Sequence, residues 1–161
     1  MISSKIANRL KTAPVVAVLL LALAAALLVT GAQTSDAHPR SAQLVGTWRM
    51  TKLELGTPGN LQPVPYSGEI IFTRAGTVSV QAMNPDAEAP DTPYTVNGYE
   101  AYFGTVAVDR RAGTFVMTVE SAAVRDLIGQ QLPRAYRVSR NTLVLTPTDP
   151  AGGFRATYER I

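Results

Sequence analysis

Eight short runs rich in β-branched and aromatic residues, separated by turn residues, constrain the fold of this 161-residue chain more than any other feature. Gly, Pro, Asn and Asp interrupt these runs, a pattern typical of strands joined by turns. Apolar residues do not recur with a helical period over any long window. The best helical stretch, residues 122–129, covers about two turns. The expected strands are residues 47–55, 69–73, 77–83, 100–108, 114–121, 134–139, 142–146 and 156–161.

Most links between these runs are short, which indicates that neighbours in sequence are also neighbours in the sheet. Residues 74–76, 109–113 and 140–141 can each form a hairpin turn. Eight antiparallel strands can close on themselves and so remove the exposed edges that promote aggregation. The sequence therefore predicts an all-β fold, a single eight-stranded antiparallel up-and-down β-barrel. A barrel of this size is filled by side chains or holds one small ligand.

The N-terminus differs from the rest of the chain. Lys5, Arg9 and Lys11 precede an uncharged apolar run at 13–32, and small residues at 30–32 and 35–37 offer cleavage sites. This order predicts a signal peptide over residues 1–37, with an apolar signal helix. A leader at 38–43 and the barrel domain at 44–161 follow. An uncleaved membrane anchor is the alternative, because a run of about 20 apolar residues can span a bilayer. We expect export to a secreted, periplasmic or cell-envelope location.

Charge and composition exclude several functional classes. Removing residues 1–37 takes away three basic residues and one acid, which lowers the net charge from +3 to +1. A nucleic-acid partner is therefore not expected. The chain has no cysteine, which excludes a thiol enzyme and a zinc–thiolate site. Its one histidine, His38, lies outside the expected barrel, which excludes a His-based triad or a multi-histidine metal site. No cofactor is expected.

The remaining ionisable groups give weak signals. An inward Glu120 would have a raised pKa and could act as a base. Alternation instead places Glu120 on the face opposite Met117 and Val119, toward solvent. Lys52 is expected to be a surface charge. Residues 84–98, which carry three prolines and three acids, form a long link that is either a lid or a floppy surface loop.

Reading the strands with a period of two gives the expected interior. Two interpretations remain open, a packed core or a pocket whose apolar walls carry a few polar groups. Tyr102 and Phe103 are adjacent and face opposite ways, so one of them must point outward. The predicted inward residues are Trp48, Met50, Ile70, Phe72, Val78, Val80, Phe103, Phe115, Met117, Tyr136, Val138, Leu143, Leu145 and Tyr158. The ligand-lining candidates among them are Met50, Phe72, Val80, Phe103, Met117, Tyr136 and Tyr158.

The first and last strands carry a recognisable pair of motifs. Gly46-Thr47-Trp48 opens the barrel region and Arg160 lies next to its end, which resembles lipocalins and their relatives. Nearly all of the chain after residue 43 is similar to one bacterial branch, the lipocalin-like domain family. The segments that carry this resemblance are LVGTWR (44–49), GEIIFT (68–73), VSVQAMNPD (78–86), YEAYFGT (99–105) and LVLTP (143–147).

The resemblance implies a fold and a closing contact rather than a reaction. It implies that Arg160 packs across Trp48, next to Gly46, and closes the base of the barrel. Members of the family often carry histidines where this chain has Met117 and Thr118, so a function that depends on those histidines is not implied here. The family has no common catalytic signature, and a fold does not imply a function.

Three functions agree with these observations. The first is an exported, monomeric protein that binds a small hydrophobic molecule in the barrel, with residues 84–98 as a partial lid. The second is an isomerase or cyclase of a biosynthetic pathway, by family analogy. The third is a structural or stress-related envelope protein with a filled interior. The membrane is a partner only if the N-terminal segment is retained.

Overall fold

The computed structural model describes residues 43–161 of the chain. The predicted signal peptide and nearly all of the leader, including His38, lie outside these residues. Within the described part, no helix is long and apolar enough to cross a membrane.

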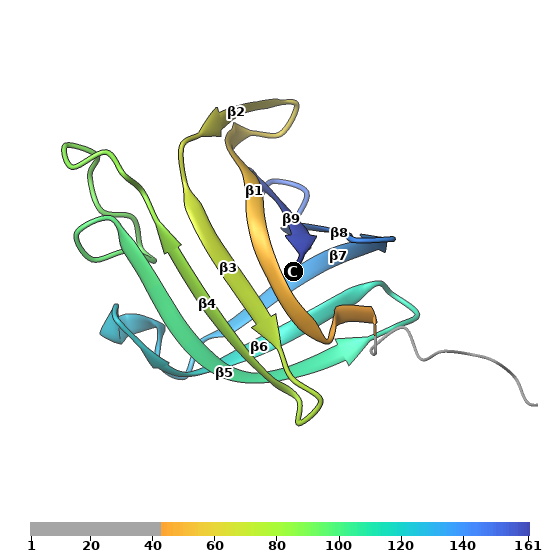
Figure 1. Ribbon diagram of the computed structural model, residues 1–161. Helices are drawn as coiled ribbons and strands as arrows, with labels where there is room; N and C mark the ends of the chain where they lie inside the picture. The colour runs from red at the N-terminus through yellow and green to blue at the C-terminus, as the bar shows by residue number, and fades with distance from the viewer. Residues whose placement is uncertain (1–42) are drawn as a thin grey trace, which may run out of the picture. The chain divides into compact units, whose positions relative to one another are not determined.

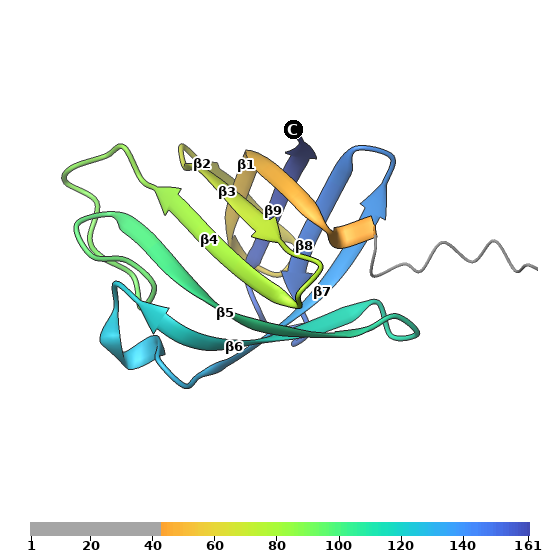
Figure 2. The same ribbon diagram turned by 60° about the horizontal axis from the view of Figure 1, so that its bottom comes forward.

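The strands form one antiparallel sheet that closes on itself (Figure 1). The sheet order is β2-β1-β3-β4-β5-β6-β7-β8-β9, and β9 also pairs with β1. Figure 2 shows the strands following one another around this ring. Eight of them, all except β2, make a closed up-and-down barrel, which confirms the predicted fold class. The strands are β1 (Gly46–Thr57), β2 (Asn60–Val64), β3 (Ser67–Phe72), β4 (Thr77–Met83), β5 (Tyr99–Asp109), β6 (Thr114–Ala122), β7 (Gln131–Ser139), β8 (Thr142–Pro147) and β9 (Phe154–Arg160).

Strand β2 was not predicted from the sequence. It pairs with the far half of β1, from Leu53 opposite Val64 to Thr57 opposite Asn60. The strand is short and contains Pro63. Proline has no N–H group to donate to a neighbouring strand, so its presence argued against a strand at this place in the sequence. The turn before it depends on Gly59, whose φ of 82° favours glycine.

Strand β1 changes its inward-facing residues halfway along. Its pairing with β9 shifts register between Met50 and Lys52, which marks a β-bulge. Because a shift of one residue exchanges the two faces of a strand, Trp48 and Met50 face inward before the bulge and Leu53 after it. Lys52 stays on the outer face, where its Nζ lies 2.8 Å from Oε1 of Glu54. The expectation that Lys52 is a surface charge is therefore confirmed.

One end of the barrel, here called the base, is closed by Trp48 and Arg160. The Trp48 side chain is fully buried, and its Nε1 donates to the carbonyl oxygen of Leu44 at 2.7 Å. The Arg160 guanidinium lies 4.0 Å from the centre of the Trp48 ring and donates to the carbonyl oxygen of Val45 at 2.7 Å. A Cβ on Gly46 would lie 2.4 Å from Nη1 of Arg160, so only glycine leaves room for this contact. This is the arrangement that the resemblance implied.

The predicted inward residues all belong to the hydrophobic core or contact it, with one exception. The prediction for Phe103 is wrong, because this side chain is 50% exposed and Tyr102 is buried instead. Val106 and Val108, farther along β5, are partly buried against the core and have the same parity as Tyr102. Strand β5 therefore turns its even-numbered residues inward. Gly104 allows close contact with β6, because a Cβ there would lie 1.9 Å from the backbone oxygen of Thr118.

The closing contact at the base can be tested by substitution. We expect Arg160→Ala to lower the free energy of unfolding by about 2 kcal/mol, because it removes a cation–π contact and charged hydrogen bonds. Urea denaturation would measure the change. Arg155→Ala, on the same strand but on the outer face, is the matched control, with an expected change within about 0.5 kcal/mol. Equal effects of the two substitutions would contradict the role of Arg160.

Candidate functional site

A cavity of about 340 Å³ occupies the interior of the barrel. Every strand of the closed ring, β1 and β3 to β9, contributes at least one side chain to its wall, so the cavity lies within the barrel. Most of these side chains are apolar, and such walls favour an apolar ligand. The apolar lining comprises Met50, Leu53, Leu55, Ile70, Val80, Ala82, Phe115, Met117, Leu145, Phe154 and Ala156.

The end of the barrel opposite the base, here called the mouth, is covered partly by loops. Figure 1 shows the β4–β5 loop at the same end as β2, while the β3–β4 turn lies at the other end. Thr92, Pro93 and Tyr94 from the β4–β5 loop line the cavity, and Tyr66 from the β2–β3 link joins them. Tyr94 also packs against the hydrophobic core.

The β4–β5 loop has its own network of hydrogen bonds. The Asp91 carboxylate accepts the backbone N–H groups of Asn97 at 2.9 Å and of Gly98 at 2.8 Å. These two bonds hold the pKa of Asp91 below its ordinary value. Thr95 is 4% exposed, and its Oγ1 accepts the N–H of Thr92 at 2.7 Å. These hydrogen bonds join residues of the β4–β5 loop to one another beside the cavity.

A group of four polar side chains, here called the polar cluster, faces the apolar cavity. It consists of Glu100 and Tyr102 on β5, Arg134 on β7 and Tyr158 on β9. The Tyr102 hydroxyl interacts with the Glu100 carboxyl group, and the charge of Arg134 acts on both. Tyr102 and Tyr158 are 8% and 4% exposed. Both charged side chains that line the cavity, Glu100 and Arg134, thus belong to this cluster.

The electrostatics of the cluster follow from burial. Desolvation raises the pKa of Glu100, against the smaller opposing effects of the neighbouring Tyr102 hydroxyl and the Arg134 charge. Desolvation, aided by the negative charge of Glu100, also raises the pKa of Tyr102 and of Tyr158. Both phenols are therefore neutral and can donate or accept a hydrogen bond. Arg134 is held in place by its Nη1 bond of 2.9 Å to the Pro133 carbonyl and by the Phe154 ring, whose centre is 5.1 Å away.

The structure brings together four of the seven predicted ligand-lining residues. Met50, Val80, Met117 and Tyr158 all line the cavity. Phe103 is absent from it, because its side chain lies on the outer face of β5.

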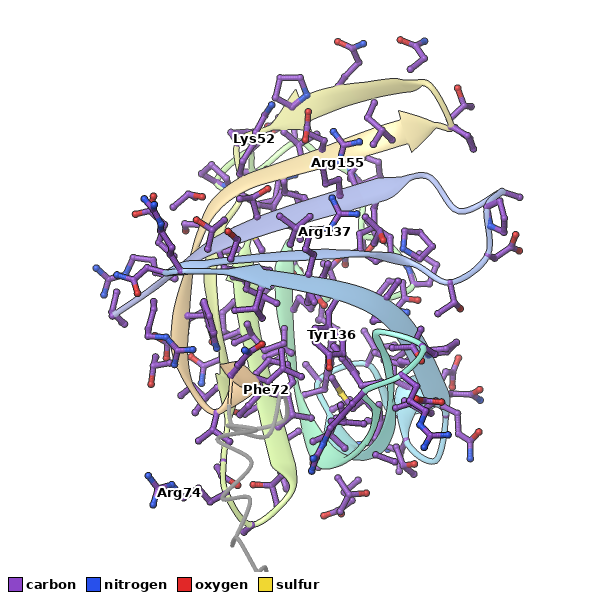
Figure 3. The ribbon with its side chains drawn as sticks, turned by 90° about the vertical axis from the view of Figure 1, so that its right-hand side faces the viewer. Lys52, Phe72, Arg74, Tyr136, Arg137 and Arg155 are labelled. Carbon is purple, nitrogen blue, oxygen red and sulfur yellow. The ribbon has the colours of Figure 1, made fainter. Side chains whose placement is uncertain are left out.

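Phe72 and Tyr136 do not line the cavity, and they instead support its wall. Their rings lie 5.5 Å and 6.1 Å from the ring of Phe115, which does face the cavity. Figure 3 shows both among the strands, with Phe72 nearer the β3–β4 turn that Arg74 marks.

Glu100, Tyr102 and Arg134 were not predicted as site residues. Glu100 and Tyr102 could have been predicted from Val106 and Val108, because all four are even-numbered residues of β5 and so share its inward face. Glu120, the carboxylate that the sequence singled out, is exposed, as the alternation predicted. Among residues 43–161, no group of three His, Cys, Asp or Glu side chains could hold a metal ion.

Comparisons with known proteins give little further information. No family model and no curated protein matches the sequence. Among solved structures, the chain is similar to one reported as "The Siderocalin Ex-FABP functions through dual ligand specificities". The two share 14% sequence identity over 74% of each chain, with a TM-score of 0.28. The barrel described above therefore rests on its own strand pairing.

The carboxyl group of Glu100, which is partly buried in the barrel, makes stability depend on pH. Because the pKa of Glu100 is raised above 4.5, its contribution to stability is complete below that value and is lost as the pH rises through the raised value. We expect Glu100→Gln to become more stable relative to the parent protein between about pH 4 and about pH 7. Urea denaturation at both pH values would measure the difference. Glu120→Gln, at an exposed position, should show no such trend, and equal trends would refute the assignment.

Proposed function

We propose that this protein is a lipocalin-like binding protein that holds one small hydrophobic molecule in the barrel cavity. The observation that carries the proposal is the cavity itself, which all eight strands of the ring line mainly with apolar side chains. Its volume of about 340 Å³ lies within the range of small-molecule sites, about 300–1,000 Å³. Met50 and Met117 in its wall can adapt to an irregular ligand.

Burial of the ligand's apolar surface supplies the binding energy. Each Å² removed from water contributes about 25 cal/mol, before the entropic costs of association. The β4–β5 loop acts as a partial lid, because Tyr94 contacts both the core and the cavity. No cofactor takes part in this mechanism.

The cellular setting is part of the same proposal. The basic start, the apolar run and the small residues before His38 support export of the barrel after cleavage of residues 1–37. The segments similar to the bacterial lipocalin-like domain family support membership of that family. We propose that the exported domain acts as a monomer.

One observation favours a second candidate function, an isomerase or cyclase. Glu100 is a carboxyl with a raised pKa inside an apolar cavity, the environment that suits a general base. Turnover would then depend on Glu100 rather than on Glu120 or Tyr136. The third candidate, an envelope protein with a solid barrel, required a filled interior, and the cavity counts against it.

Filling the cavity tests the binding proposal. Ala82 and Ala156 are buried in its wall, so Ala82→Leu and Ala156→Leu each place new side-chain atoms in it. We expect each to weaken binding of the neutral fluorescent probe N-phenyl-1-naphthylamine by at least about tenfold. A fluorescence titration gives the affinity, and thermal unfolding shows that each variant is folded.

The matched control is Ala107→Leu, which adds the same atoms at an exposed position of β5. This variant should bind the probe as the parent protein does. Undiminished binding by both cavity variants would refute the proposal, as would a folded parent protein that does not bind the probe at all.

A further inference from the structure

The polar cluster differs in composition from a simple anion or cation site. It contains one carboxyl group on Glu100, one guanidinium on Arg134, and the neutral phenols of Tyr102 and Tyr158. Opposite charges therefore face the same apolar cavity. We propose that the cluster selects a neutral ligand, an apolar body that ends in a hydroxyl group, over a carboxylate or an ammonium ion of the same chain length. This inference rests on the proposed binding function.

The strand pairing leaves the cluster open toward the ligand. Glu100 lies opposite Ala82, and Tyr102 opposite Val80, across the β4–β5 ladder. These four residues share the inward face, and the side chain opposite Glu100 is only a methyl group. The carboxyl group is therefore not covered by its cross-strand neighbour.

The two charged groups of the cluster do not neutralise each other by contact. Within residues 43–161, the only ion pairs closer than 4.0 Å join Glu54 to Lys52 and to Arg155. Glu100 and Arg134 interact through their charges at a longer distance. A ligand group placed at the cluster therefore experiences both charges.

This arrangement penalises a charged head group of either sign. A carboxylate would be buried beside the Glu100 carboxyl, and an ammonium ion beside the Arg134 guanidinium, and each would pay for burial of charge with a like charge nearby. A hydroxyl group carries no charge, donates to Glu100 and accepts from Tyr158 or Arg134. An alcohol can thus satisfy the cluster without adding a buried charge.

Three matched probes test the inference. n-Decanol, decanoate and decylammonium share one alkyl chain and differ only in the head group, and each is used to displace N-phenyl-1-naphthylamine at neutral pH. We expect decanol to bind at least about tenfold more tightly than either ion. Equal affinities, or tighter binding of either ion, would overturn the inference. Because the alkyl chains would still bind, the proposed function would stand.

Charge substitutions give an independent readout from the same titration. Glu100→Gln should improve decanoate relative to decanol, and Arg134→Gln should improve decylammonium relative to decanol. Glu120→Gln and Arg137→Gln, both exposed on the outer face, should leave the order unchanged. Head-group preferences that do not respond to the two cluster substitutions would count against the inference.

A milder variant guards against loss of fold. Tyr158→Phe removes only a hydroxyl, and it should reduce the preference for decanol while decanoate and decylammonium change less. An unchanged preference would remove Tyr158 from the inferred site. Failure of the parent protein to bind either the fluorescent probe or any decyl compound would instead refute the proposed function.

Discussion

The pairing of β1 with β9 is the constraint on which the rest of this structure depends. It joins the two ends of the folded domain, turns an open meander into a ring and leaves the eight strands without a free edge among themselves. Trp48 and Arg160 sit on this seam, one on each strand, and the guanidinium over the indole fastens the first strand to the last. The cavity exists because the ring is closed, since its wall needs a side chain from every strand.

The same seam divides the interior into two unlike halves. Toward the base, Trp48 is fully buried, with Arg160 stacked on its ring. Toward the mouth, the bulge in β1 turns Leu53 and Leu55 inward, where both line the cavity. If β1 continued past Met50 in unbroken alternation, with no bulge, Lys52 and Glu54 would point into the barrel and the two leucines toward water. A hydrophobic mouth and a charged outer wall are thus consequences of one irregularity in pairing.

The fold could be predicted from the sequence much further than the site. Turn residues and the alternation of apolar and polar residues predict eight strands, because every second side chain of a strand with one buried face is apolar. Strand β2 has no such pattern, since it pairs outside the ring and contains Pro63. The bulge at Thr51 likewise has no recognisable pattern in the sequence. Phe103 was misplaced because it and the adjacent Tyr102 are both aromatic, so side-chain type alone does not say which points inward; the inward orientation of Val106 and Val108 does. Glu100 was overlooked because its inward orientation follows from the same alternation along β5.

The single tryptophan of the chain lies at the base, and four of its six tyrosines, Tyr66, Tyr94, Tyr102 and Tyr158, line the cavity. The protein therefore separates its intrinsic fluorophores by location. Indole emission reports whether the seam between the first and last strands is intact, and phenol absorption reports what surrounds the interior space. A molecule in the cavity would therefore lie against phenol rings, while the indole stays in the seam beside Arg160.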